Sequence, residues 1–289
     1  MSAYGYLDEA LAGLMYGLDS HTNMPSGKAQ EVIQFGWPVF GFPGALDLIY
    51  GGHIDESLLT LASGLSTSNV FNVQISVAFP AQYQNSGLVL AATTLTSAAL
   101  SITYAVSAYA SMSAMVAAIN ADTNMIAAGV SASCNAAGTI LTILITPNST
   151  YQMGDLTVTS SITGGSVPAI TTTYTTQMRF LGVAVFEQRA HRIFGAGSEE
   201  YLQYEPLGYV QMGKLYVPVA NSVTGKNVAY PIIGGTNKNS FTDSSSPSGG
   251  YVYSPFSSSP LSGVQPVFQD SAVTVAGSLL AKLMVRGPY

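Results

Sequence analysis

The stretch RFLGVAVFEQRAHRIFGAGSEEYLQYEPLGYVQMGKLYVPV, from Arg179 to Val219, decides the fold of this chain. It contains two apolar runs, Phe180 to Phe186 and Tyr209 to Val219, that are rich in β-branched and aromatic residues. Glycines interrupt both runs, and this combination is typical of strands separated by turns. Both runs therefore predict β-strands, and we expect the rest of the chain to be built onto them.

The amino-acid composition limits the class of protein before any motif does. Hydrophobic residues make up 47% of the 289 residues, enough for a core, and charged residues only 8%, against roughly 25% in an average protein. Disordered chains show the opposite pattern, low hydrophobicity and high charge. With 9 Lys and Arg and a net charge of -6, the chain lacks the clustered cations that replace phosphate counterions. We expect a folded chain that binds no nucleic acid.

The cysteine content and the apolar segments limit the chemistry further. A single cysteine, Cys134, excludes an intrachain disulfide and a multi-cysteine metal site, and its alternating context predicts a small, half-buried residue. The N-terminus lacks the basic segment and unbroken apolar core of a secretory signal. The most apolar long region, 88–119, is broken repeatedly by Ser and Thr, so it lacks the roughly 18 consecutive apolar residues that a membrane span needs. We expect a chain without a signal peptide or membrane contact, made in the cytoplasm.

Residues 61–176 differ in composition from the rest and read as a separate module. No Lys or Arg occurs between Lys28 and Arg179, and the acids of the module are Asp122 and Asp155. Strand-like runs such as VFNVQISVAF at 70–79 surround one helical pattern at 111–120, for which Ser111 is a plausible N-cap. The sequence therefore predicts a small α/β domain, 61–176, inserted into a discontinuous, mainly β barrel or sandwich domain of residues 1–60 and 177–289.

Several apolar and aromatic residues are candidates for contacts with other subunits. A stripe that includes Leu7 and Leu11 predicts a short amphipathic helix, which docks either on its own domain or on a neighbouring subunit. The segment VIQFGWPVFGFP carries four rings that either fill the core or form an interface hot spot; they are Phe35, Trp37, Phe40 and Phe42.

Two loop regions add further candidates. Arg189 and Arg192 lie in a charged connection that is either a solvated loop or an electrostatic contact with a partner subunit. The Gly/Ser/Pro-rich run 234–263, which carries Tyr251 and Tyr253, predicts a large loop.

The sequence gives little support for enzymatic activity. The three histidines, His21, His53 and His191, lie in unrelated contexts, and no H-E-x-x-H, G-x-S-x-G, P-loop or G-x-G-x-x-G motif occurs. Adjacent acids such as Asp55 and Glu56 point apart on a helix or a strand and make poor acid–base pairs. We expect no enzyme, no cofactor and no metal site.

A set of short phrases resembles the phage structural cement, or head decoration, proteins. They are FLGVAV at 180–185, GKLYVPV at 213–219 and GKNVAY at 225–230, with FGWPV at 35–39 resembling the first strand and LAKL at 280–283 the last. The order strand, helix ending AAINA at 117–121, strand, turn, strand is similar to a small α/β module inserted in phage virion and flagellar proteins.

This resemblance implies a function. It implies a capsid decoration protein that binds the outer surface of the head and stabilises contacts between capsomers of the major capsid protein. A homodimer or homotrimer on a symmetry axis is expected, located on the virion after synthesis in the host cytoplasm. Two alternatives remain: a tail or baseplate component, or a carbohydrate-binding adhesin that uses Tyr251 and Tyr253 for a weak contact with glycans.

Overall fold

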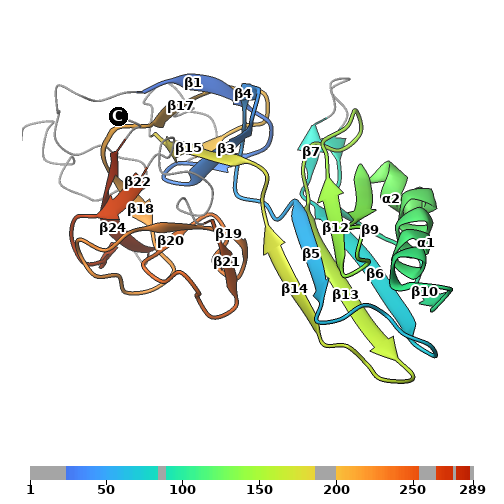
Figure 1. Ribbon diagram of the computed structural model, residues 1–289. Coiled ribbons are helices and arrows are strands. Elements are labelled where there is room, and N and C mark those ends of the chain that lie inside the picture. The colour runs from blue at the N-terminus through green and yellow to red at the C-terminus, as the bar shows by residue number, and fades with distance from the viewer. Residues whose placement is uncertain (1–23, 84–88, 186–199, 254–264, 276–277, 287–289) are drawn as a thin grey trace, which may run out of the picture. The chain divides into compact units, whose positions relative to one another are not determined.

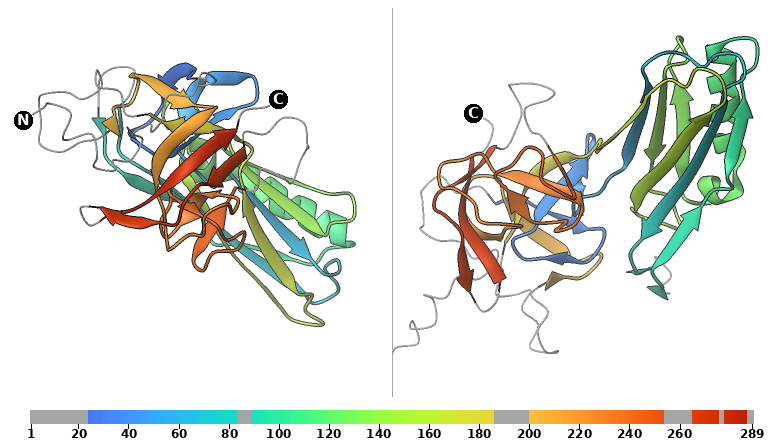
Figure 2. Two further views of the ribbon diagram at one scale, coloured as in Figure 1. Left: turned by 90° about the vertical axis from the view of Figure 1, so that its left-hand side faces the viewer. Right: turned by 90° about the horizontal axis from the view of Figure 1, so that it is seen from below.

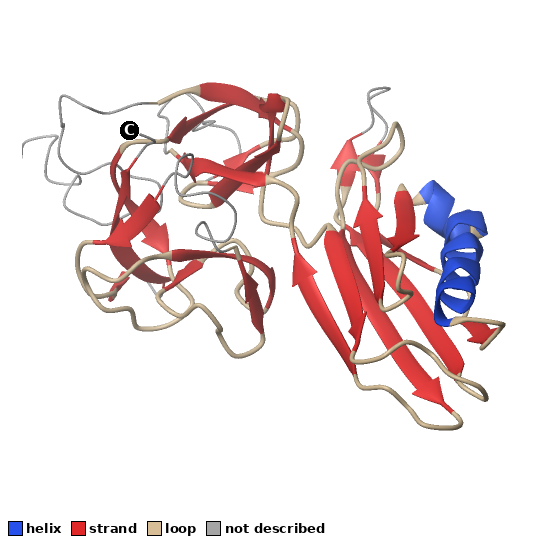
Figure 3. Cartoon of the chain, in the orientation of Figure 1, coloured by secondary structure: helices blue, strands red, loops and turns tan. Residues whose placement is uncertain are grey.

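The chain folds into two compact units. The computed structural model describes residues 24–83, 89–185, 200–253, 265–275 and 278–286. Residues 1–52 and 178–289 form one unit, here called the barrel unit, and residues 53–177 form the other, here called the inserted unit. The structure is mostly β, with 50% strand and 9% helix, and it contains a closed five-stranded barrel and a small helical part (Figures 1 and 3). The predicted mainly β fold class is confirmed.

The structure moves the first boundary of the inserted unit from residue 60 to residue 52. The reason is the position of β5 (Glu56–Leu61), which lies inside a sheet of the inserted unit. It pairs on one side with β12 (Ile140–Ile145) and on the other with β14 (Ile170–Thr175). The second boundary lies after Gln177, one residue beyond the predicted end at 176.

Five strands close the barrel in the order β1, β17, β15, β3, β4. They are β1 (Ser26–Ala29), β17 (Pro206–Val210), β15 (Arg179–Ala184), β3 (Pro38–Phe42) and β4 (Ala45–Tyr50). The ring closes because β1 pairs antiparallel with β17 and parallel with β4. The pairing of β15 with β3 shifts register at Gly182, where a Cβ atom would lie 2.2 Å from the carbonyl oxygen of Val210. Glycine is therefore required at this position.

Smaller sheets complete the barrel unit. The ribbon of β2 (Ile33–Gln34) and β16 (Glu200–Tyr201) is separate from a sheet of β18 (Gly213–Pro218), β24 (Ser278–Arg286), β22 (Gln265–Phe268) and β23 (Val273–Val275). A third sheet places β19 (Tyr230–Gly235) between β20 (Phe241–Thr242) and β21 (Gly250–Val252). Strands β20 and β21 fall within the run 234–263, for which the sequence predicted only a loop.

The predicted strand from Tyr209 to Val219 is two strands, and the prediction of a single strand is wrong. Strand β17 ends at Val210 and β18 begins at Gly213. The first pairs with β1 and β15 in the barrel, whereas the second pairs with β24 in another sheet. The chain therefore changes sheets at Gln211 and Met212.

Two sheets of the inserted unit each bury one face. In the first, β6 (Val70–Phe79) lies between β13 (Asp155–Thr163) and the shorter strands β9 (Thr93–Thr96) and β10 (Leu100–Thr103). The second has the order β11 (Val130–Cys134), β12, β5, β14. A short ribbon of β7 (Gln82–Tyr83) and β8 (Val89–Leu90) extends from the unit. Alternation along β6 directs Phe71, Ile75 and Phe79 into the core, and Figure 2 shows the two sheets as layers.

The helices of the inserted unit are α1 (Ala108–Ala121) and α2 (Thr123–Ala127). Helix α1 packs against β10 and β11, an edge strand from each of the two sheets, and lies on one side of the strands (Figure 3). Its N-cap is Ser107, whose hydroxyl accepts from the amide of Ala110 at 3.1 Å. Ser111, the predicted cap, is instead buried within the first turn, where its hydroxyl donates to the Ser107 carbonyl. Neither described helix has the length and apolar character needed to cross a bilayer.

Candidate functional site

Two of the four rings predicted near residue 37 lie in or against the core of the barrel. Phe35 is buried and meets the ring of Tyr201 edge to face, with centroids 5.1 Å apart. Trp37 is partly buried and packs against the same core cluster. Phe35 therefore has no surface for a partner, and the core alternative that the sequence left open holds for it.

A second aromatic cluster joins the barrel to the third sheet of its unit. Phe40 of β3 lies 5.6 Å from Phe180 of β15 and 5.5 Å from Tyr253, and Phe180 lies 6.4 Å from Phe241 of β20. Phe40 is fully buried. Edge-to-face pairs of this kind add about 0.5–1.5 kcal/mol each to the free energy of burial. The core alternative that the sequence left open therefore holds for Phe40 as well: it belongs to an internal cluster together with Tyr253, a residue singled out in a different part of the sequence.

The remaining predicted contact residues are dispersed. Phe42 is half-buried against Tyr50, with ring centroids 5.6 Å apart. Tyr251 is 40% exposed and is the predicted sugar platform whose ring remains accessible. Leu7, Leu11, Arg189 and Arg192 lie outside the described residues. The structure therefore does not gather the predicted residues into one site.

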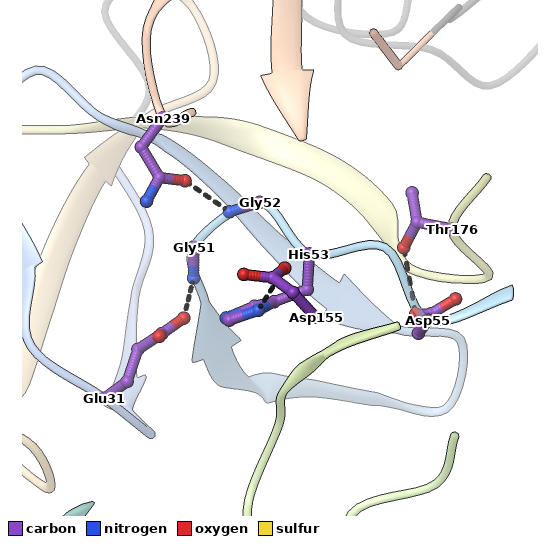
Figure 4. Close-up of polar contacts among 8 residues, drawn as sticks. All are labelled: Glu31, Gly51, Gly52, His53, Asp55, Asp155, Thr176 and Asn239. Carbon is purple, nitrogen blue, oxygen red and sulfur yellow. Dashed lines mark hydrogen bonds and ion pairs between the residues drawn. The ribbon is translucent and has the colours of Figure 1, made fainter. Parts of the chain in front are cut away.

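A polar cluster that the sequence did not predict lies at the end of the inserted unit where the chain enters and leaves it. His53 Nδ1 lies 3.2 Å from the carboxylate of Asp155. His53 is 1% exposed, whereas the Asp155 side chain is 34% exposed. The imidazole is therefore held between the entry segment and the beginning of β13 (Figure 4). The backbone amide of Leu156 reinforces this contact by donating a 3.0 Å hydrogen bond to the Ile54 carbonyl.

Asp55 fastens the entry of the inserted unit to its exit. Its carboxylate accepts from the Thr176 hydroxyl at 2.9 Å and from the Gln177 amide at 2.7 Å. Burial raises the pKa of Asp55 to about 6, against the lowering effect of these two hydrogen bonds and of His53. The loss of hydration on burial thus raises the pKa of Asp55 more than the hydrogen bonds and His53 lower it. The Glu56 carboxyl nearby also has a raised pKa, again because of burial.

The barrel unit ends in a second polar arrangement of its own, at Gly51 and Gly52. The amide of Gly51 donates to the Glu31 carboxylate at 2.6 Å, and the amide of Gly52 donates to the Asn239 side chain at 2.7 Å (Figure 4). A Cβ atom on Gly52 would lie 2.9 Å from Ile233 Cα. Two glycines are needed because the backbone passes close to these neighbours.

These polar groups are placed for structure rather than for chemistry on a substrate. His53 and Asp55 are buried, so a reactant has no access to the histidine or to the Asp55 carboxylate. In the described parts of the chain, no three His, Cys, Asp or Glu residues form a group that could hold a metal ion. The sequence contained one signal for this cluster: Asp155 is one of two acids in the stretch 61–176. An isolated acid in an otherwise uncharged segment indicates a specific hydrogen-bond or ion-pair partner.

The surface of the inserted unit carries very little charge. Residues 53–177 contain no Lys or Arg and four acids, of which Asp55, Asp122 and Asp155 accept hydrogen bonds inside the unit. The exposed residues of β13 are all Ser or Thr; they are Thr157, Thr159, Ser161 and Thr163. Association of this unit with any partner is therefore not steered by charge.

Two strand edges of the inserted unit are covered by single side chains. The amide of Asn120 in α1 accepts from the backbone N–H of Ala132 at 2.8 Å and donates to its carbonyl at 3.0 Å, as a neighbouring strand would. The Tyr174 hydroxyl does the same for Val158 in β13, at 2.9 and 3.0 Å. Both contacts satisfy backbone groups that a strand edge leaves unpaired.

No protein-family model, curated protein sequence or solved structure matches the chain significantly. The resemblance to cement proteins therefore remains a prediction from the quoted phrases.

Proposed function

We propose that this chain is a structural protein of a phage virion that decorates the capsid. One observation carries the proposal: four of the phrases that resemble cement proteins pair two by two. The end of FGWPV and FLGVAV belong to the pair β3 and β15, in which Val39 lies opposite Gly182 and Pro38 opposite Val183. GKLYVPV and LAKL belong to the pair β18 and β24, in which Val217 lies opposite Ala281. Phrases far apart in the sequence thus form two hydrogen-bonded strand pairs, one in the barrel and one in a separate sheet of the same unit.

The distribution of charge is compatible with a mechanical role. All 9 Lys and Arg of the chain lie within residues 1–52 and 178–289. The inserted unit has a neutral, hydroxyl-rich surface. Charged groups set register and specificity at an interface, so the barrel unit is the half of the chain suited to a defined contact with the shell.

The proposed mechanism is the addition of buried interface between neighbouring capsomers of the major capsid protein. Each bound copy contributes contact area that must be broken before the shell expands under internal DNA pressure. A homodimer or homotrimer is the expected bound form because equivalent sites on a shell favour symmetric binders. The protein is then located on the outer surface of the virion.

Labelling of purified virions tests the location. Serum raised against the full chain and detected with immunogold should distribute over the head. Gold confined to the tail would replace the proposal by a tail or baseplate role. Absence of gold from virions that contain the chain by mass spectrometry would place it inside the particle and would also overturn surface decoration.

A heat-release assay tests the stabilising role separately. Heads that lack the chain should release DNA at a lower temperature than complete heads, and added purified chain should restore the difference. Unchanged release temperatures would contradict stabilisation even if the location is correct. A glycan array with the same purified chain tests the adhesin alternative. An adhesin should bind glycans through the exposed ring of Tyr251, and Tyr251→Ala should then abolish the binding.

A further inference from the structure

The outer edge of β14 differs from the outer edges of β11 and β13, on which a side chain bonds the backbone. On its inner side β14 pairs with β5, with Ile170 opposite Leu61 and Thr172 opposite Leu59. The amide of Leu61 bonds to the Thr139 carbonyl at 2.8 Å on the far side of β5. Alternate residues of β5 face β12, so the residues opposite them, Ile170 and Thr172, direct their backbone N–H and C=O groups away from the sheet.

No residue in the described part of the chain bonds these outward groups of Ile170 and Thr172. On the edges of β11 and β13, by contrast, side chains bond the backbone of one residue each: Asn120 bonds Ala132 and Tyr174 bonds Val158. Natural proteins otherwise blunt a bare edge with Lys, Pro or a bulge. The segment 169–177, AITTTYTTQ, has no charged residue, no Pro and no Gly, and its pairing with β5 is regular. The edge is therefore open to strand addition.

We propose that β14 pairs antiparallel with β14 of a second copy, about a two-fold axis at Thr172, so that one continuous sheet crosses the dimer. The central residues, Thr171, Thr172 and Thr173, read the same in both directions, so an antiparallel copy presents identical partners. In this register Thr172 exchanges two backbone hydrogen bonds with its own copy, and Thr171 lies opposite Thr173.

The partner is a second copy because the edge is self-complementary and uncharged. Threonines directly opposite each other across strands stabilise an antiparallel pair, and two copies bring no like charges together along 169–177. A two-fold contact of this kind closes on itself and leaves no further edge on β14. The inference does not rest on the proposed function, because it holds for the chain in solution with or without a capsid.

Sedimentation velocity of the full chain over a concentration series tests the proposal. The wild-type chain should form dimers, and Thr172→Pro should raise the dimer dissociation constant by at least about tenfold, because it removes the outward N–H from both copies. The fold should survive, since this N–H has no role in the pairing with β5. A chain that is monomeric throughout, or a dimer that Thr172→Pro leaves unchanged, would overturn the proposal.

A second variant pair guards against a folding defect in the proline variant. The double substitution Thr171→Lys with Thr173→Lys places lysines opposite each other across the proposed dimer and should abolish it. Its control, Thr157→Lys with Thr159→Lys, adds the same charge to the exposed residues of β13 and should leave the dimer intact. If both double variants weaken the dimer equally, the weakening comes from the added charge alone, and the β14 contact is rejected.

Cross-linking fixes the register. In antiparallel strands the Cα atoms of a hydrogen-bonded pair lie about 5.5 Å apart, within the range of a disulfide. Thr172→Cys should therefore form a covalent dimer under mild oxidation. The wild-type chain, which contains Cys134, is the control and should remain uncross-linked. A variant that cross-links no faster than the control would exclude the register centred on Thr172.

Discussion

The two units of this chain solve the problem of strand edges in different ways. The barrel unit closes five strands into a ring, so that each barrel strand has two neighbours. The inserted unit keeps open sheets and covers individual edges with side chains, Asn120 on β11 and Tyr174 on β13. Closure removes the edges altogether, whereas side-chain cover removes them one backbone group at a time.

This difference indicates which residues each unit depends on. In the barrel the constraint is backbone geometry, since Gly182 packs directly against the Val210 carbonyl. The inserted unit also depends on a small number of polar side chains. We therefore expect an added methyl group at Gly182 to harm the barrel, and removal of the Tyr174 hydroxyl or the Asp55 carboxylate to harm the inserted unit.

The largest expected effect is on the barrel. Gly182→Ala should lower the free energy of unfolding of the barrel unit by about 3 kcal/mol or more, because its Cβ would meet backbone that has no room to move. Gly44→Ala is the matched control: it also has a positive φ, 92°, but nothing lies within 4 Å of its Cβ, so it should lose only about 1 kcal/mol of strain energy. Calorimetry of both variants checks the difference, and equal losses would refute the role of closure.

The next effect is a pH dependence of the inserted unit. Asp55 has a folded pKa of about 6 against an ordinary 3.8, so its contribution to stability is fully present below pH 3.8 and is lost as the pH rises through 6. The unit should be more stable at pH 4 than at pH 7, by about 3 kcal/mol at most from this group. Glu56 acts in the same direction. The barrel groups with raised pKa values, Tyr50 and Tyr209, titrate far above this range.

Denaturant unfolding at pH 4 and pH 7 measures this dependence. Asp55→Asn should reduce it for the inserted unit and leave only the part that comes from Glu56, while Asp270→Asn, which alters an exposed aspartate of the barrel unit, should leave it unchanged. An undiminished pH dependence in Asp55→Asn would assign the effect to other groups.

A smaller effect should follow the loss of one edge cover. Tyr174→Phe leaves both backbone groups of Val158 without their partner, and an unsatisfied buried pair costs about 1–3 kcal/mol. Tyr104→Phe removes a hydroxyl of the same unit that makes no hydrogen bond within the described residues, so it should be nearly neutral. Thermal unfolding compares the two, and an equally mild Tyr174→Phe would mean that water replaces the hydroxyl.

The smallest effect concerns the helix that covers β10 and β11. Ser107→Ala removes the N-cap of α1 and should cost about 1 kcal/mol. Ser101→Ala, on the exposed face of β10, is its control and should change stability by less than about 0.5 kcal/mol. Hydrogen exchange in the first turn of α1 should rise in Ser107→Ala alone, and unchanged exchange would contradict the observed cap.

Much of the strand pattern could be predicted from local sequence. Residues 70–79 were predicted as a strand, and β6 spans Val70 to Phe79, because its apolar residues alternate without interruption and Pro80 follows. The start of α1 was misplaced because Ser107 and Ser111 are equally good caps on propensity. The burial of Ser111 in contact with Ala105 and Ser107 depends on the packed structure.

The polar contacts could not be predicted because they depend on register between distant segments. Asp55 meets Thr176 and Gln177 only after β5 and β14 have paired, and Tyr174 reaches Val158 only when the two sheets are packed. The aromatic residues at 35–42 were recognised as a group, yet they divide between two elements. Phe35, in the turn after β2, lies in the barrel core, and Phe40 of β3 contacts Phe180 and Tyr253.

The link between Asp55 and the pair Thr176 and Gln177 has a mechanical consequence. The inserted unit is connected to the rest of the chain at the same end of two adjacent antiparallel strands, with Glu56 opposite Thr175. Tension applied through these two connections pulls the strands apart sideways, and their hydrogen bonds carry the load one pair after another rather than together. Between these two strands, the hydrogen bonds from Thr176 and Gln177 to the Asp55 carboxylate are the first in that sequence. The unit should therefore peel open from this end at low force, and the force at which it yields should be set by the bonds of Asp55.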